Sequence, residues 1–278
     1  MQPSTNRQES HIVSSERDFL EAAREAALAA GRVLEEWADK FTVSEKGPAD
    51  LVTEADVAAQ NAIVSVLQPR FPQHGFLGEE GLRHAAGAGD FRWIIDPLDG
   101  TTNYVHRFPY YAVSIALEQA GELVAGVIYD PSKRELFAAL RGAGATLNDQ
   151  PLRTSRFHRL RDSMVIASFP PNAKADSPPL KRFLHVINHA QTVHRSGSAA
   201  LNLAYVAAGR LDGYWSTSLK PWDMAAGVLI AREAGGRATR MDGGRLDLSI
   251  PDILCTNGTA LHEELSLRLG EVESGTAP

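Results

Sequence analysis

Residues 93–103 read Trp-Ile-Ile-Asp-Pro-Leu-Asp-Gly-Thr-Thr-Asn, and this stretch decides how the rest of the chain is interpreted. Its three apolar residues predict a buried strand that ends in two carboxylates, Asp96 and Asp99. Gly100 and two threonines follow and open onto an expected helix. Acids at a strand end can converge on one hard cation, and free N–H groups at a helix start can hold an anion. The two sites together indicate metal-assisted chemistry on a phosphate.

Composition limits the classes of protein to which the chain can belong. With 278 residues, 44% hydrophobic and 22% charged, it can bury a large core. The net charge of −6 argues against nucleic acid as a partner, and an acidic protein that handles phosphate esters needs cations to cancel repulsion. Cys255 is the only cysteine, which excludes an intrachain disulfide and a zinc–thiolate site.

The ends of the chain are expected to be disordered, over residues 1–14 and 271–278, because both are rich in polar residues, glycine or proline. Residues 1–15 lack the apolar region of a signal peptide, and no apolar run approaches the roughly 20 residues of a membrane span. We therefore expect a soluble, cytoplasmic protein without a membrane partner. Between the tails we expect an N-terminal metal-binding α+β half (15–160) and a C-terminal α/β half (161–270), forming one globular unit.

Hydrophobic periodicity predicts the main elements. A first helix is expected from a cap at Ser14-Ser15 to about Lys40, then a loop over 41–49, and a second helix over 54–70 capped by Thr53. An antiparallel sheet is expected from strands at 111–118, 123–129 and 135–139. Residues 83–90 are read as a flexible connection. The second half alternates strands at 164–167, 192–195, 213–215 and 253–256 with helices at 180–189, 198–208 and 223–234 and a last helix.

Three further acidic places bear on the site. Glu79 lies in Gly78-Glu79-Glu80 after an apolar pair, Asp56 lies at the entrance to the second helix, and Asp223 lies at the start of an apolar helix. Taken singly, each has an ordinary structural explanation: a solvated turn for the glutamates, a helix cap for Asp223. Their combination with Asp96 and Asp99 is what favours a site.

Together these segments resemble the inositol monophosphatase family, among the lithium-sensitive phosphatases that include fructose-1,6-bisphosphatases. The family signatures match residues 93–106 (WIIDPLDGTTNYVH) and 222–236 (WDMAAGVLIAREAGG), and the acidic segments at 50–56 and 78–80 occur in the family order. The resemblance spans about residues 16–270. It implies a layered α-β-α-β-α sandwich of the inositol monophosphatase and fructose-1,6-bisphosphatase type, and a homodimer.

The resemblance also implies a Mg²⁺ site between the halves. Glu79, Asp96 and the Leu98 carbonyl would ligate one ion. Asp96, Asp99 and Asp223 would ligate a second, with Asp96 bridging. Two or three ions per subunit are expected, and hard oxygen ligands fit Mg²⁺, with Mn²⁺ as a substitute.

The same resemblance implies catalytic roles. Glu79 and the Thr101 hydroxyl would assist a metal-bound water in its attack on phosphorus. A third, weaker ion would use Glu79 through water and, in some members, the acid that is Asp56 here. The N–H groups of Gly100 and Thr101 would hold phosphate oxygens. No covalent phosphoenzyme is required, and sensitivity to Li⁺ is expected.

Two other interpretations fit part of the sequence. A haloacid-dehalogenase site would space its acids one residue apart, but two residues separate Asp96 from Asp99, so that reading is discounted. A non-catalytic regulatory scaffold of the same fold is the alternative to an enzyme. The presence of every acid expected to contact the metals argues against a scaffold.

The substrate is left open. Inositol-hydrolysing members carry a glutamate seven residues before the second-signature aspartate, and this chain has Ser216 there. A hydroxyl cannot accept two ring hydroxyls as a carboxylate can. An inositol-1-phosphate-like polyol or sugar phosphate is the first expectation, with histidinol phosphate, fructose-1,6-bisphosphate and a 3′-phosphonucleotide as alternatives. The expected substrate contacts are Asp99, Gly100, Thr101, Thr102, Gly197, Ser198, Ala199, Ser216 and Asp223.

Overall fold

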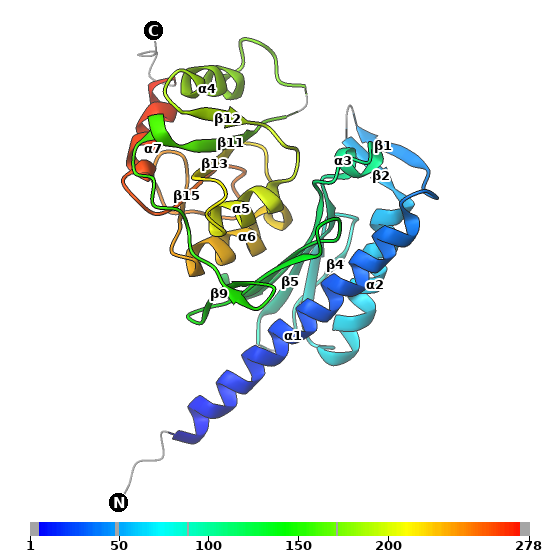
Figure 1. Cartoon of the computed structure of the whole chain (residues 1–278). Coiled ribbons are helices and arrows are strands. Elements are labelled where there is room, and N and C mark those ends of the chain that lie inside the picture. Colours follow the sequence, from blue (N-terminus) through cyan, green and yellow to red (C-terminus); the bar gives the residue numbers. More distant parts are fainter. Residues whose placement is uncertain (1–5, 48–49, 88, 171, 273–278) are drawn as a thin grey trace, which may run out of the picture.

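The structure is a computed structural model that describes residues 6–47, 50–87, 89–170 and 172–272. Five layers follow one another across it (Figure 1), and they confirm the expected α-β-α-β-α sandwich. The layers are α1 (Asn6–Trp37) with α2 (Glu54–Arg70), an eight-stranded sheet, α5 (Ala199–Ala207) with α6 (Pro221–Glu233), a five-stranded sheet, and α4 (Pro178–Ile187) with α7 (Leu261–Glu271).

The first sheet has the strand order β10-β9-β8-β7-β6-β5-β3-β4. All neighbours are antiparallel except β3 and β5, which run parallel. Its strands are β3 (Gly75–Gly78), β4 (Arg83–His84), β5 (Phe91–Asp99), β6 (Ala112–Gln119), β7 (Glu122–Asp130), β8 (Glu135–Leu140), β9 (Gly144–Leu147) and β10 (Gln150–Pro151).

The second sheet has the order β12-β11-β13-β15-β14, with β11 parallel to both of its neighbours. Its strands are β11 (Met164–Ser168), β12 (Thr192–His194), β13 (Gly213–Ser216), β14 (Arg237–Thr239) and β15 (Ile253–Thr256). The 3₁₀ turn η1 (Leu160–Asp162) precedes β11. Residues 152–163 therefore connect the last strand of the first sheet to β11, and the division into two halves near residue 160 stays a prediction.

The middle of strand β5, residues 93–95, is apolar because both faces of the strand are covered there. Trp93 and Ile95 belong to the core shared with α1 and α2, whereas Ile94 belongs to the core shared with α5 and α6. A strand buried on both faces reads as a continuous hydrophobic run. On the second side, Gly227 lets α6 lie close to α5, since a Cβ there would be 2.5 Å from the Cβ of Leu203. These contacts fix the position of the end of β5.

Several local expectations need correction. Helix α1 begins at Asn6, so residues 6–14 are helical rather than a disordered tail, and the helix contains no proline between Asn6 and Trp37. Part of the expected loop at 41–49 forms a hairpin, β1 (Val43–Gly47) with β2 (Asp50–Thr53). Residues 1–5 and 273–278 lie outside the described part of the chain. Helix α2 matches its expected bounds, with Thr53 as its N-cap.

No helix in the described ranges is both long enough and apolar enough to cross a lipid bilayer.

Candidate active site

The two acids of the opening motif reach the same face of the first sheet because β5 contains a bulge. Asp96 pairs with Ser114 and Asp99 with Ala112, so three steps along β5 oppose two along β6. In a regular strand, residues three apart point to opposite faces, and a bulge re-aims the later side chain. The insertion lies at Pro97, which has no N–H to give to the ladder.

The chain then turns sharply into the short helix α3 (Thr101–Val105). Gly100 has φ +95°, a left-handed conformation that side-chain-bearing residues rarely adopt. The Thr101 hydroxyl lies 3.1 Å from the Leu98 carbonyl oxygen and 3.2 Å from Asp56 Oδ1. Asp56 is itself held by the Thr53 N–H (2.8 Å) and hydroxyl (2.6 Å). The buried Asp56 therefore positions the Thr101 hydroxyl.

Two other elements bring further carboxylates to the end of β5. Strand β3 runs parallel to β5, and the Glu79 N–H donates to the Ile95 carbonyl (3.3 Å), which places Glu79 beside Asp96. Asp223 lies in the first turn of α6, where one of its oxygens accepts from the Lys220 N–H (2.8 Å). Residues from β3, β5 and α6 thus meet at one place.

These elements surround a pocket of about 210 Å³. Nine of the expected site residues line it: Glu79, Asp96, Leu98, Asp99, Gly100, Thr101, Gly197, Ala199 and Asp223. The pocket joins the first half of the chain to the second, and it holds the four expected metal-binding carboxylates together.

Burial and mutual repulsion act on the acids of this pocket. Asp96 is 1% exposed, and burial, followed by the charges of Glu79, Asp99 and Asp223, raises its pKa well above the usual range. Burial and then the charge of Asp99 likewise raise the pKa of Asp223. Each of these carboxylates is therefore costly to ionise unless a cation compensates it.

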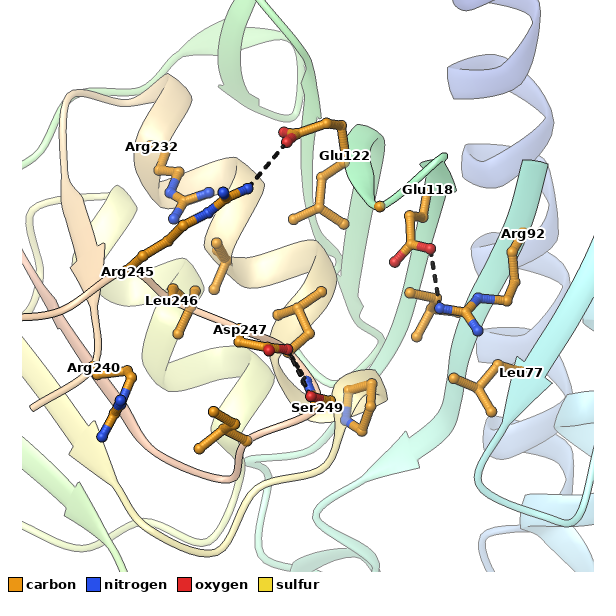
Figure 2. Close-up of a pocket in the computed structure, with 17 residues that line it drawn as sticks. Leu77, Arg92, Glu118, Glu122, Arg232, Arg240, Arg245, Leu246, Asp247 and Ser249 are labelled. Carbon is orange, nitrogen blue, oxygen red and sulfur yellow. Dashed lines mark hydrogen bonds and ion pairs between the residues drawn. The ribbon is translucent and has the colours of Figure 1, made fainter. Parts of the chain in front are cut away.

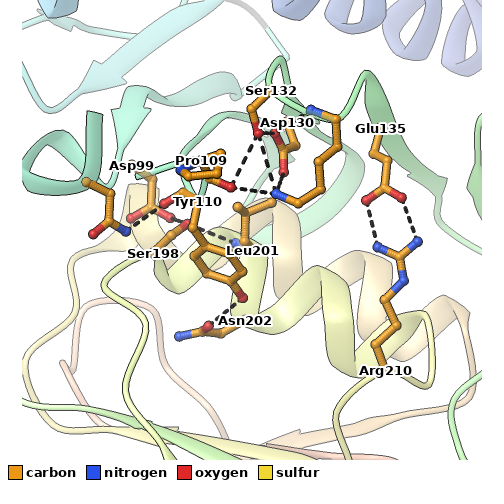
Figure 3. A network of polar contacts seen from close by, with 12 residues as sticks. Asp99, Pro109, Tyr110, Asp130, Ser132, Glu135, Ser198, Leu201, Asn202 and Arg210 are labelled. Atoms are coloured by element: carbon orange, nitrogen blue, oxygen red, sulfur yellow. Dashed lines mark hydrogen bonds and ion pairs between the residues drawn. The ribbon is translucent and has the colours of Figure 1, made fainter. Parts of the chain in front are cut away.

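Asp99 connects the two halves (Figure 3). Its oxygens accept hydrogen bonds from the Ser198 hydroxyl (2.5 Å) and from the N–H groups of Ala199 (3.2 Å) and Ala200 (2.7 Å), at the start of α5. Burial raises the pKa of Asp99 to about 6, and these hydrogen bonds limit the rise. Tyr110 adds a second connection through its hydroxyl to Asn202 Oδ1 (3.0 Å).

The donor atoms suit a hard divalent cation. The carboxylates and the Leu98 carbonyl supply only oxygen, and they repel one another in a buried pocket, which a cation would relieve. Over the described ranges, however, no three His, Cys, Asp or Glu side chains are already arranged to hold an ion. Both Asp99 oxygens are taken up by hydrogen bonds from Ser198, Ala199 and Ala200. The ligand assignments therefore stay predictions.

Four expected site residues do not line the pocket. Asp56 lies behind Thr101, and Thr102 is exposed on α3. Ser198 is buried as the N-cap of α5 and contacts Asp99. Ser216 is fully buried in β13, where its hydroxyl lies 3.3 Å from the Ser218 N–H. Ser216 therefore does not line this pocket, and its contact with substrate stays a prediction.

The pocket also contains residues that the sequence did not single out: Ser168, Phe169, Arg195 and Leu219. The Arg195 guanidinium stacks on the Phe169 ring, 4.7 Å from its centroid, and lies 3.4 Å from the Phe169 carbonyl. No ion pair with Arg195 occurs within the described part of the chain. It is the one cation that lines this acidic pocket there. Arg195 comes directly before the strand-to-helix turn at Gly197, and this position is the feature of the sequence that could have identified it as a pocket residue.

Comparison with known proteins agrees with this geometry. The sequence profile of the inositol monophosphatase family matches residues 15–273. An inositol-1-monophosphatase of Rhizobium meliloti is 46% identical over 216 residues, covering 77% of this chain and 81% of that protein. The Nus factor SuhB of Escherichia coli K12 is 40% identical over 243 residues, covering 86% and 91%.

Solved structures extend the similarity to three dimensions. The extragenic suppressor protein suhB of Bartonella henselae matches with a TM-score of 0.86 and 42% identity, covering 91% of this chain and 98% of that one. The inositol monophosphatase of Anabaena matches with a TM-score of 0.82 and 39% identity, covering 92% and 96%. The chain belongs to the inositol monophosphatase family.

Proposed function

We propose that the protein is a Mg²⁺-dependent phosphomonoesterase that hydrolyses a small phosphate ester by direct attack of water. The observation that carries the proposal is the convergence of Glu79, Asp96, Asp99 and Asp223 with the start of α3 in one pocket. Membership of the inositol monophosphatase family supports a phosphatase.

Glu79, Asp96, Asp99, Asp223 and the Leu98 carbonyl would hold the ions. Bound Mg²⁺ supplies Lewis-acid activation of water and neutralises charge on the phosphate. We propose that Mn²⁺ can substitute for Mg²⁺ and that each subunit binds two or three ions.

The protein groups then have separate tasks. The Glu79 carboxylate accepts the proton of the attacking water. The Thr101 hydroxyl, held by Asp56 and the Leu98 carbonyl, orients that water. The N–H groups of Gly100 and Thr101 bind phosphate oxygens where negative charge increases.

The test is phosphate release from a panel of esters, with Mg²⁺ and with EDTA. We expect release that EDTA abolishes and that Asp96→Asn removes. Asp149→Asn is the matched control, because Asp149 is an exposed acid paired with Arg24 far from the pocket. If no ester is hydrolysed in a metal-dependent manner, the enzyme proposal fails, and the result favours a regulatory scaffold of the same fold. The relatives named Nus factor are the reason to keep that alternative.

Arg195 favours substrates that carry a second anionic group. The Arg195 guanidinium stacks on the Phe169 ring, has no carboxylate partner among the described residues, and can bind a carboxylate or phosphate. Ser216 stands where inositol-hydrolysing members have a glutamate, whose charge would repel a second anionic group. This ranks fructose-1,6-bisphosphate and a 3′-phosphonucleotide above inositol-1-phosphate and histidinol phosphate. Arg195→Gln should lower kcat/KM for a bisphosphate more than for β-glycerophosphate. Equal losses on both esters would contradict this role.

Inhibition by Li⁺, a homodimer and a cytoplasmic location are proposed with the activity. Li⁺ inhibition should be uncompetitive in steady-state kinetics. The dimer would cover exposed apolar side chains such as Phe108, Phe157 and Leu184, and light scattering after gel filtration measures it. The single cysteine, Cys255, is a buried free thiol, as suits a reducing compartment.

A further inference from the structure

A second and larger cavity has a volume of about 760 Å³, and Figure 2 shows the residues that line it. Its walls come from β3, β5, the turn between β6 and β7, α6 and the segment 240–250. A volume of this size is typical of small-molecule sites. The proposed reaction uses none of its residues.

The cavity shares its walls with the catalytic pocket. Leu77 precedes Glu79 by two residues, Ile94 precedes Asp96 by two, and Pro221 precedes Asp223 by two. Ile94 and Asp96 both lie in β5, where residues two apart point to the same face, about 7 Å from one another. Leu77 and Glu79 lie at the end of β3, and Pro221 and Asp223 lie in the first turn of α6. The cavity and the pocket are therefore neighbours along one face of the first sheet.

Helix α6 links the two sites mechanically. Asp223 lies in its first turn and Arg232 in its last, and Val228 between them lines the cavity. The helix is packed on both sides in the central core, so it moves as a rigid unit. A ligand that pulls on Arg232 would act on the position of Asp223.

The chemistry of the cavity suits an anion with an apolar body. Arg232 donates to the Ala238 carbonyl (3.2 Å) and, within the described ranges, pairs with no carboxylate. Arg245 lies 3.5 Å from Glu122, but these side chains are 90% and 64% exposed, so the contact is weak. Arg92 is already paired with Glu118 through Nη2 (3.0 Å), and only its buried Nε has no hydrogen-bond acceptor among the described residues, so Arg232 and Arg245 are the arginines offered to a ligand. Leu77, Ile94 and Val228 supply apolar wall.

We propose that this cavity binds an anionic small molecule with an aromatic or aliphatic body, and that its occupancy changes the affinity of the adjacent pocket for Mg²⁺. The head group, a phosphate, sulfonate or carboxylate, is held by Arg232 and Arg245. The body lies against Leu77, Ile94 and Val228. The coupling half of the proposal rests on the proposed metal site, whereas the binding half does not.

The binding half is tested with 8-anilinonaphthalene-1-sulfonate, by fluorescence titration of the full-length protein in EDTA. The double variant Arg232→Gln/Arg245→Gln should raise the Kd roughly tenfold or more, since two charge-assisted contacts are lost. Arg153→Gln/Arg156→Gln is the matched control, because it removes the same charge from exposed arginines outside the cavity. Arg232→Lys should keep most of the affinity. Equal affinities for the double variant and wild type, or equal losses in the control, would overturn the site.

The coupling half is tested by titrating the same probe at saturating Mg²⁺. Its Kd should change severalfold, and by linkage the Mg²⁺ midpoint from thermal shifts should change by the same factor in saturating probe. An unchanged Kd, in a protein whose melting temperature does respond to Mg²⁺, would overturn the coupling. A protein that binds the probe but does not respond to Mg²⁺ would instead refute the proposed metal-dependent function.

Discussion

Replacing Asp96 by asparagine should stabilise the metal-free protein while removing its activity. Asp96 is buried, is repelled by Glu79, Asp99 and Asp223, and accepts a hydrogen bond from the Leu98 N–H (3.0 Å). Asparagine keeps the size and that acceptor but removes the charge. We expect the free energy of unfolding to rise by roughly 1–3 kcal/mol, as for other unpaired buried charges.

The pH dependence gives the sign of this effect a second check. The pKa of Asp96 is raised in the folded state, so ionisation above the unfolded-state pKa of about 4 favours unfolding. The advantage of Asp96→Asn should therefore be absent below that pH and grow as the pH rises. At pH 8 in EDTA it should raise Tm by roughly 2–4 °C per kcal/mol.

Asp130→Asn is the matched control, because it makes the same chemical change at another buried acid of the first sheet. Asp130 is paired with Lys133 Nζ (2.7 Å) and accepts from the Ser132 hydroxyl (2.6 Å). Its replacement should therefore lower Tm, opposite in sign to Asp96→Asn. The assay is thermal unfolding by circular dichroism, with EDTA and with Mg²⁺. A lower Tm for Asp96→Asn at pH 8 in EDTA would refute the reasoning.

Three further predictions concern single residues. Asp99→Asn should remove nearly all turnover and also lower stability, because an amide cannot accept all three hydrogen bonds from α5; kcat near wild type at saturating Mg²⁺ would contradict this. Ser216→Glu should lower KM for inositol-1-phosphate relative to a bisphosphate, because the side chain at position 216 lies on the same strand face as Tyr214, toward α5 and α6. An unchanged ratio of kcat/KM between the two substrates would contradict this prediction. The buried His262, between the hydroxyls of Thr239 and Thr256, has its pKa lowered to about 4, so stability should fall by about 3 kcal/mol as the pH drops from 6.5 toward 4; urea unfolding should show a smaller fall in His262→Gln.

The sequence predicted the fold best where local signals and burial agree. Helix α2 has its expected bounds because Thr53 caps it and Pro72 follows its end. The hairpin of β1 and β2 was missed because its strands have only five and four residues, too few to show an alternating pattern. The motifs located the acids that line the candidate pocket. The sequence did not predict that Asp96 and Asp99 share one face of the sheet, because a bulge depends on the register with the partner strand.

The substrate side of the site was less predictable. Arg195 and Phe169 lie 26 residues apart, and their stacking arises only when β11 and β12 pair. The strand expected at 213–215 stopped one residue short of Ser216, which is the last residue of β13, and a sequence pattern does not tell how far a short side chain reaches. Contacts between segments that are distant in the sequence leave no local pattern of hydrophobic residues from which they could be predicted.

The hydrogen bonds from α5 to Asp99 set an order for how the site is completed during synthesis. The first sheet is complete once residue 151 has been made, but the donors to Asp99 come from residues 198–200. Until that segment leaves the ribosome, the carboxylates at the end of β5 have neither their helix partner nor Asp223. A nascent chain that stops between the two sheets would therefore expose the apolar face meant for α5 and α6 together with an incomplete acidic site. Such a fragment is the species that chaperones would have to shield.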